Sequence, residues 1–288
     1  MTLSIILEEL TMSVVTRIIK RFFAERFFDE AAQTAYYLLL SVFPFLIFIL
    51  SLVSFFPVDE QQLLSFLRPF APGNSFAFIE DNVASILSAD KGRVLSLSLL
   101  ASFWISSMAV QALARALNEA NGIQTTQPYW KNLIRDLGVT LLFMMLVPLS
   151  LFLPFIEDGL HWLVSKAGSI ENWQGWIYIW PKVKWGLGSL FLFLFFLLFY
   201  VIVPNKRFSF RDVWPGALLS AVGWQVVSLL FADYVAKVNY GRLYGQLGGI
   251  IILVLWFYLT AVVILLSGLL IDEIRTVRLS KNRKRKVL

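Results

Sequence analysis

The chain has 288 residues, of which 58% are hydrophobic and only 15% are charged, and its mean hydropathy is +0.71. In soluble domains roughly a quarter of the residues are charged, and a globule of this size cannot bury so much apolar surface. The composition therefore excludes a soluble enzyme and indicates a membrane protein whose apolar surface faces lipid.

The N-terminal segment, residues 1–30, is predicted to be cytoplasmic and amphipathic, with a helix over residues 3–30. Apolar side chains such as Ile18 and Phe22 alternate with basic ones such as Arg17 and Arg21, as in helices that lie on a membrane surface. The segment is interpreted as an anchor ahead of the first span, and a gate that slides with that span is the alternative.

Six segments are apolar over roughly the 20 residues that a membrane-spanning helix needs. They must be helical, because backbone groups in lipid have to be hydrogen-bonded within the segment. We therefore predict an all-α, polytopic membrane protein with six transmembrane helices in a domain over residues 31–272 and a basic cytoplasmic tail over 273–288. The helices are placed at about residues 31–56, 94–117, 136–157, 183–204, 213–235 and 247–271.

The first outer loop, residues 57–93, is long and carries apolar residues at helical spacing. Pro69, Pro72 and Gly73 interrupt this pattern. The loop is therefore expected to hold two short amphipathic helices.

Basic residues set the orientation. Four Lys or Arg lie in the N-terminal segment, three around the second loop, three in the fourth loop and seven at the C-terminus, which places 17 of the 25 on one side. Because Lys and Arg are retained in the cytoplasm during insertion, both termini of this multi-pass protein are predicted to be cytoplasmic. The pI near 9.5 is accordingly attributed to topology and to contact with anionic membrane lipids, not to nucleic-acid binding.

The first predicted span has an unusual number of polar side chains, which are candidates for lining a substrate pathway. Pro44 lies in the middle of this span, where it removes a backbone hydrogen bond, so a kink or an opening of the helix is expected. Ordinary helix packing is the alternative explanation. The candidates are Gln33, Thr34, Tyr36, Tyr37, Ser41 and Pro44.

Polar or glycine-rich groups elsewhere complete the predicted pathway. Glycines at intervals of four before the last span permit close helix packing or a re-entrant turn, and they allow a homo-oligomer equally well. The further candidates are Gln111, Arg115 and Asn118 at the end of the second span, Gln225 in the fifth, and Tyr240, Gly241, Tyr244 and Gly245 before the sixth.

Catalytic machinery is not visible in the sequence. The single histidine is His161, cysteine is absent, and no metal-ligand motif, nucleophile elbow or phosphate-binding loop occurs. The chain is therefore predicted not to be an enzyme and to use neither a metal nor a cofactor.

Several segments resemble one known family. They are Ala31-Ala-Gln-Thr-Ala-Tyr-Tyr-Leu-Leu-Leu-Ser-Val-Phe-Pro44, the run from Tyr240 to Gly248, the segment Leu255-Trp-Phe-Tyr-Leu259, and Ser267-Gly268. Their order and spacing are similar to those of the YihY/BrkB family of bacterial inner-membrane proteins, over nearly the whole chain. The resemblance implies six helices with cytoplasmic termini. The family that the chain resembles was formerly labelled ribonuclease BN, which is widely regarded as a misassignment. Some of its members are linked to lipid or lipopolysaccharide export.

The leading functional hypothesis is an inner-membrane transporter or flippase-like protein for an amphipathic or lipid-like envelope component. Polar groups in the first span, the glycine run and the absence of charges from the middle of the spans favour a mostly neutral pathway. The alternative is a non-transporting envelope-integrity scaffold, and a ribonuclease is disfavoured. The expected partners are membrane lipids, anionic ones above all, with no nucleic acid.

Overall fold

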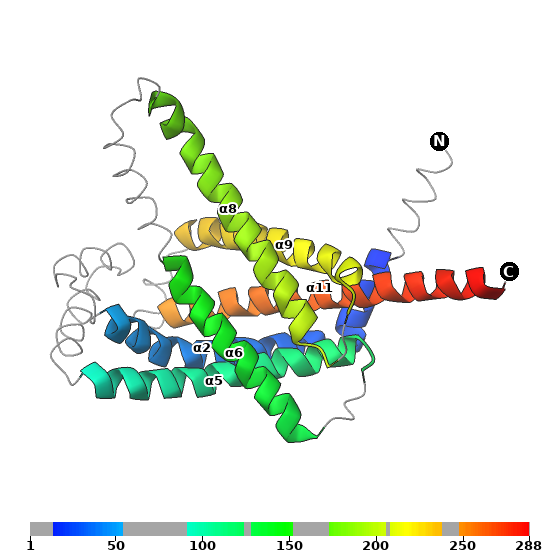
Figure 1. Ribbon diagram of the computed structural model, residues 1–288, viewed down its shortest axis with the longest axis horizontal. Coiled ribbons are helices and arrows are strands. Elements are labelled where there is room, and N and C mark those ends of the chain that lie inside the picture. The colour runs from blue at the N-terminus through cyan, green and yellow to red at the C-terminus, as the bar shows by residue number, and fades with distance from the viewer. Residues whose placement is uncertain are drawn as a thin grey trace. The chain divides into compact units, whose positions relative to one another are not determined.

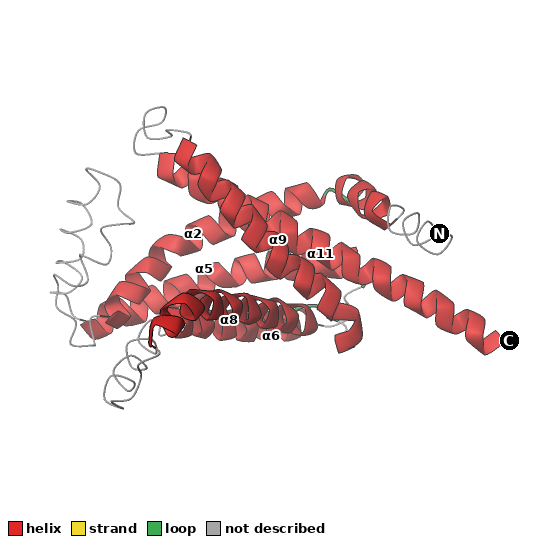
Figure 2. Ribbon diagram, turned by 90° about the horizontal axis from the view of Figure 1, so that it is seen from above, coloured by secondary structure: helices red, strands yellow, loops and turns green. Residues whose placement is uncertain are grey.

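A computed structural model describes residues 14–53, 91–123, 128–151, 173–205, 208–237 and 248–287. A short helix over residues 14–24 precedes six long helices (Figure 1). The described residues contain no strand (Figure 2), which confirms the all-α prediction. The long helices are α2 (Phe27–Val53), α5 (Lys91–Ala120), α6 (Tyr129–Leu151), α8 (Trp173–Ile202), α9 (Phe210–Lys237) and α11 (Gly248–Val287).

Each of the six predicted spans overlaps one of these long helices. Four helices contain stretches that are long and apolar enough to cross a membrane, namely Ser96–Ala120, Trp185–Ile202, Phe210–Lys237 and Gly248–Arg278. The polytopic membrane class is thus confirmed, whereas a count of six crossings stays a prediction. The basic C-terminal segment continues α11 to Val287.

Some predictions fall outside the described residues. They are residues 3–13 of the amphipathic helix, the two short helices of the first outer loop, and Tyr240, Gly241, Tyr244 and Gly245 of the glycine run.

The prediction of one continuous amphipathic helix up to residue 30 is wrong. The helix ends at residue 24, and a turn at Glu25 and Arg26 leads into α2. Arg26 adopts a left-handed conformation with φ of 60°, which a helix interior does not permit. Hydrogen bonds from the Arg26 N–H to the Phe23 carbonyl (3.3 Å) and from the Asp29 N–H to the Arg26 carbonyl (2.9 Å) fix this turn.

The chain divides into two compact units. The first comprises Met1–Tyr36 and Ala109–Leu288, and the second comprises Tyr37–Met108. In the first unit, α9 packs against both α8 and α11. At its contact with α11, a Cβ on Gly216 would lie 2.9 Å from the backbone carbonyl oxygen of Ser267, so only glycine fits there without displacing α11.

The second unit contains the rest of α2 and the beginning of α5. Its buried serines use their hydroxyl groups within their own helix, since Ser41 donates to the Leu38 carbonyl (2.8 Å) and Ser102 to the Leu99 carbonyl (3.1 Å). The helix α2 runs unbroken through Pro44, so the helix does not open there, and the alternative expectation of a kink stays a prediction. In lipid, the other backbone groups gain their hydrogen bonds only if the helix continues past the proline.

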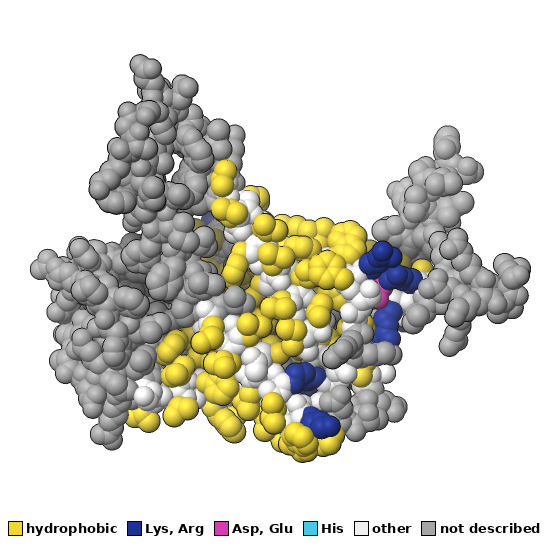
Figure 3. All heavy atoms as spheres, in the orientation of Figure 1, with side chains coloured by type: hydrophobic (Ala, Val, Ile, Leu, Met, Phe, Trp, Pro, Cys, Tyr) yellow, Lys and Arg dark blue, Asp and Glu magenta, His cyan; other side chains and the backbone are white. Residues whose placement is uncertain are grey.

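Large apolar side chains gather on the face of the described residues that Figure 3 shows. On α8, Leu190, Leu194 and Leu198 recur every four residues, with exposed fractions of 51%, 51% and 37%. Leu229 and Leu230 on α9 are exposed by 64% and 66%. Continuous exposed stripes of this kind are what a lipid-facing helix requires.

Candidate functional site

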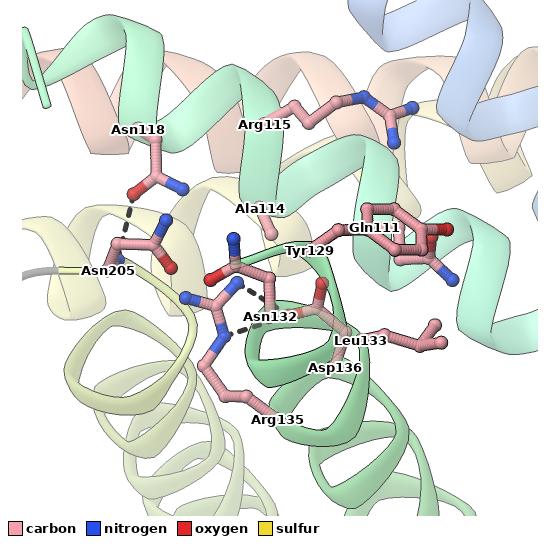
Figure 4. A pocket seen from close by; sticks show the side chains of 10 residues that line it. All are labelled: Gln111, Ala114, Arg115, Asn118, Tyr129, Asn132, Leu133, Arg135, Asp136 and Asn205. Atoms are coloured by element: carbon pink, nitrogen blue, oxygen red, sulfur yellow. Dashed lines mark hydrogen bonds and ion pairs between the residues drawn. The ribbon is translucent and has the colours of Figure 1, made fainter. Parts of the chain in front are cut away.

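A pocket that is bordered mostly by polar and charged residues, named the polar pocket for that reason, lies in the first unit, at the point where α5 ends and α6 begins (Figure 4). Its volume is about 220 Å³. Side chains from α5, from α6 and from the segment after α8 line it. They are Gln111, Ala114, Arg115, Asn118, Tyr129, Asn132, Leu133, Arg135, Asp136 and Asn205.

The wall formed by α5 is fixed by the way in which that helix ends. Gly122 adopts a left-handed φ of 58°, and its N–H donates to the Glu119 carbonyl at 2.9 Å. The Ile123 N–H donates to the Asn118 carbonyl at 2.8 Å, which completes a Schellman cap. The apolar Ile123 side chain then packs against the core of the unit. The chain is thereby turned out of α5 at a fixed position and directed toward α6.

Asn118 also holds the third wall of the pocket. Its Oδ1 atom accepts a hydrogen bond from the backbone N–H of Asn205 at 2.8 Å, and the side chain is buried. Asn205 follows directly after α8, so this bond joins the end of α8 to α5. An uncapped N–H would otherwise be buried here at a cost of about 1–3 kcal/mol.

An ion pair between neighbours on α6 forms the most strongly polar side of the pocket. Arg135 donates from Nε (2.9 Å) and Nη2 (2.7 Å) to the same oxygen, Oδ1 of Asp136. The side chain of Asp136 is only 6% exposed and that of Arg135 is 21% exposed. The charges of the two side chains therefore compensate each other within the wall.

Arg115 lies on the opposite wall, and its positive charge acts on the carboxylates of both Glu30 and Asp136. In Figure 4 its side chain extends from α5 away from Asn132 and Asp136, toward the N-terminal part of the chain. Burial raises the pKa of the Glu30 carboxyl group, and the positive charge of Arg115 acts in the opposite direction. Glu30 precedes the first predicted span, and its Oε2 atom is buried without a hydrogen-bond partner among the described residues. Arg115 thus supplies the compensating charge for this carboxylate.

A second charged cluster, which we name the ionic clamp, ties the N-terminal helix to α5 and α11. Arg21 donates from Nη1 to Oδ2 of Asp272 (2.9 Å) and from Nη2 to the carbonyl of Ala120 at the end of α5 (2.8 Å). Arg17 donates from Nε to Oε2 of Glu273 at 3.2 Å. The clamp consists of these four charged side chains and the Ala120 carbonyl.

The structure brings together only three of the residues that the sequence predicted for a substrate pathway, namely Gln111, Arg115 and Asn118. Thr34 is buried and donates to the Glu30 carbonyl of its own helix (2.8 Å), while Gln33 and Tyr36 are exposed. Tyr37, Ser41 and Pro44 belong to the second unit.

Gln225 makes contacts away from the pocket. Its Oε1 atom accepts a hydrogen bond from the Ser189 hydroxyl (3.0 Å), and its Nε2 group donates to the Ala221 carbonyl (3.1 Å). This amide therefore joins α9 to α8. Its predicted place in a pathway stays a prediction.

Sequence analysis missed five polar residues of the pocket, which are Tyr129, Asn132, Arg135, Asp136 and Asn205. Four lining residues, Tyr129, Asn132, Leu133 and Asp136, follow the spacing i, i+3, i+4, i+7 that places side chains on one helix face. This signal was available, but residues before 136 were assigned to a loop. The helix begins seven residues earlier than expected, at Tyr129.

Comparison with known proteins identifies the family of the chain. The family model described as Virulence factor BrkB matches residues 18–287. The chain belongs to the BrkB family. The resemblance found in the sequence is thereby confirmed.

Bacterial proteins that are similar to this chain carry two kinds of name. A protein of Bacillus subtilis (strain 168), named "Putative ribonuclease-like protein YfkH", is 32% identical over 258 residues, which are 89% of this chain and 93% of that protein. A UPF0761 membrane protein of Aliivibrio salmonicida is 26% identical, over 86% of this chain and 79% of that protein. A UPF0761 membrane protein of Xanthomonas campestris is 25% identical over 90% of this chain, which spans only 60% of that protein's length. No solved structure matches.

The chain is thus a multi-pass helical membrane protein of the BrkB family. In the part of the chain that the structure describes, no three His, Cys, Asp or Glu side chains lie close enough to hold a metal ion. His161 lies outside that part.

Proposed function

We propose that this BrkB-family protein is an inner-membrane transporter or flippase-like protein for an amphipathic, lipid-like envelope component, and that the polar pocket receives the headgroup of this component. The protein would act without chemical catalysis and without a metal or a cofactor. Arg135, Asp136 and the amides of the pocket would hold the headgroup.

The observation that carries this proposal is a polar pocket at one end of helices whose outer faces are apolar. A bound amphipathic molecule can place its headgroup among Asn118, Asn132 and Arg135 while its acyl chains lie along exposed leucines in lipid. The pocket volume of about 220 Å³ is below the ~300–1,000 Å³ that is usual for a whole drug-sized ligand. The space therefore suits a headgroup and not a complete lipid.

The direct test is movement of headgroup-labelled lipids across liposomes that contain the purified protein. We expect movement well above that in empty liposomes and a large loss with Asn118→Leu. Gly138→Ala on α6 is a suitable control, because a Cβ there meets nothing within 4 Å. No movement with any anionic or glycolipid class would overturn the proposal. Stable co-purification with a partner protein would then favour the envelope scaffold.

We also propose that the pocket opens toward the cytoplasm and that both termini lie on that side, where the basic C-terminal segment contacts anionic lipids. Lys131 beside the pocket and Lys237 at the end of α9 fall on opposite sides in this orientation. Because the chain has no cysteine, Lys131→Cys and Lys237→Cys provide unique labels. In intact cells a membrane-impermeant maleimide should label only the cysteine at position 237, and the reverse pattern would overturn the orientation.

A further inference from the structure

The geometry points to a specific headgroup class: the pocket at α5, α6 and the end of α8 binds an uncharged, hydroxyl-bearing headgroup of the sugar or polyol type. This inference rests on the proposed function in that it assigns the headgroup of the same site. It follows from the charges, the hydrogen-bonding groups and the size of the pocket.

The charged side chains of the pocket are already compensated. Both hydrogen bonds of Arg135 are to Asp136, and the positive charge of Arg115 acts on the carboxylates of Glu30 and Asp136. A phosphate monoester would meet the carboxylate of Asp136 and would have to compete with it for Arg135. An ammonium group would lie beside the positive guanidinium group of Arg135. A neutral ligand avoids both penalties.

Several polar atoms at the pocket have no partner among the described residues. The Asn132 Oδ1 atom is buried without a hydrogen bond, although Asn132 lines the cavity. Asp136 uses only Oδ1 in its pair with Arg135, so Oδ2 is left as a second acceptor. A buried polar atom such as Oδ1 of Asn132 costs stability unless a ligand or water satisfies it.

Hydrogen-bond donors also line the pocket, beside these acceptors. The amide Nδ2 of Asn118 and the Nη1 group of Arg135 have no hydrogen bond within the described part of the chain, and the Tyr129 hydroxyl lies at the same cavity. A phosphate offers only acceptors and an ammonium offers only donors. Each hydroxyl group offers one donor and two acceptor lone pairs, so several adjacent hydroxyls match this mixed lining.

The size and shape of the cavity agree with one ring. Its volume of about 220 Å³ equals the space of roughly seven water molecules at ~30 Å³ each. Tyr129 is 74% exposed at the start of α6, where its ring offers an apolar surface beside a polar hydroxyl. The C–H face of a sugar ring can lie on such a surface while the hydroxyls bind the amides.

The test is lipid binding by the purified full-length protein, followed by native mass spectrometry. Three probes are compared: a glucosyl diacylglycerol, phosphatidic acid with the same acyl chains, and phosphatidylcholine with the same acyl chains. The glucosyl lipid should bind at least tenfold more tightly than either of the others. Equal or tighter binding of phosphatidic acid would overturn the inference, as would the absence of any preference.

Variants tie the preference to the pocket. Asn132→Leu keeps the approximate size of the side chain but removes the amide, and it should abolish most of the preference for the glucosyl lipid. Lys131→Leu, which changes the neighbouring exposed residue outside the lining, should leave the preference intact. Should Asn132→Leu fail to fold, Asp136→Asn is the second variant, because it keeps the shape and removes the charge. An unchanged preference in a folded pocket variant would overturn the inference.

A competition experiment with a soluble compound distinguishes binding of the free headgroup from binding of the whole lipid. Glucosylglycerol in excess should displace the glucosyl lipid if the pocket binds the headgroup alone, and failure to displace it would mean that acyl chains in lipid are also required. Both results keep the sugar-binding pocket, whereas displacement by inorganic phosphate but not by glucosylglycerol would overturn it. Selective binding without transbilayer movement would overturn the proposed transport and leave this inference standing. Movement without a headgroup preference would overturn this inference and leave the proposed transport standing.

Discussion

Two polar regions of the first unit both join helices to one another, one through neutral groups and the other through charged groups. One is a neutral centre formed by Tyr200 on α8, Ser220 on α9 and the Ile264 carbonyl on α11. The Tyr200 hydroxyl donates to that carbonyl at 2.7 Å and lies 2.6 Å from the Ser220 hydroxyl. The other is the ionic clamp, in which Arg21 joins the N-terminal helix to α5 and α11.

The difference follows from the surroundings of each region. All three residues of the neutral centre lie inside candidate membrane spans, and Tyr200 and Ser220 are almost fully buried. A charge there would cost several kcal/mol, so neutral groups make the contacts between helices. The clamp lies near the end of the N-terminal helix, at the end of α5 and near one end of the α11 stretch Gly248–Arg278. Arg21 keeps 26% of its side chain exposed there, and Asp272 keeps 19%. Charges can be used there because water still reaches them.

The largest effect is expected from breaking the helix contact beside the neutral centre. Gly216→Leu would push the new side chain against the Ser267 carbonyl and the Ile271 side chain, since even a Cβ is too close to both. We expect a loss of about 3 kcal/mol of stability or failure to fold, at the upper end of the cost of overpacking. Thermal unfolding followed by tryptophan fluorescence measures this loss.

The matched control for this substitution is Gly138→Leu on α6, where a Cβ meets nothing within 4 Å. That variant should be neutral or slightly stabilising, because leucine is a better helix former than glycine. If both variants were equally unstable, close packing of α9 on α11 would not be the cause.

The next largest effect is expected from removing the central residue of the clamp. Arg21→Met leaves Asp272, Glu25 and the Ala120 carbonyl without their main donor. Hydrogen bonds to charged groups contribute about 1.5–3 kcal/mol, and partial exposure places this loss near the lower limit. Unfolding at low and at high salt should show a smaller difference between variant and parent at high salt, because salt screens exposed charges. A difference that salt does not change would contradict an electrostatic clamp.

The neutral centre is tested by Tyr200→Phe, which removes one hydroxyl and preserves the ring. We expect a loss of about 1 kcal/mol, since hydrogen bonds between membrane helices are weak on average. Salt should not alter this loss, in contrast to the clamp. Tyr234→Phe, at a side chain that is 47% exposed on α9, serves as the control and should change stability very little. A salt-dependent effect at Tyr200 would remove the distinction between the two regions.

The sequence predicted the neutral regions better than the charged ones. Apolar runs of about 20 residues identified all six long helices, because each run is continuous and nearly free of charge. Helix ends were predicted less accurately: α6 begins in a polar stretch, and the Glu25–Arg26 turn depends on one backbone conformation that no pattern indicated.

The candidate site was predicted only in part for the same reason. Gln111, Arg115 and Asn118 were noticed because they interrupt an apolar helix, whereas Asn132, Arg135 and Asp136 resemble an ordinary polar loop in the sequence. Their meeting depends on contacts between segments far apart in the chain, such as the bond between Asn118 and Asn205, 87 residues away. Local patterns contain no information about such pairs. The ionic clamp, whose partners are 251 and 256 residues apart, was missed on the same ground.

The smallest effect is expected at the outer pair of the clamp. Arg17 contacts Glu273 at 3.2 Å, but its side chain is 48% exposed, so solvent and side-chain entropy offset most of the attraction. Arg17→Met should therefore cost less than about 0.5 kcal/mol, and the cost should vanish at high salt. A loss as large as that of Arg21→Met would mean that charge alone holds the N-terminal helix in place. A much smaller loss would instead assign that role to the two contacts of Arg21 that Arg17 does not make, with Asp272 and with the last carbonyl of α5.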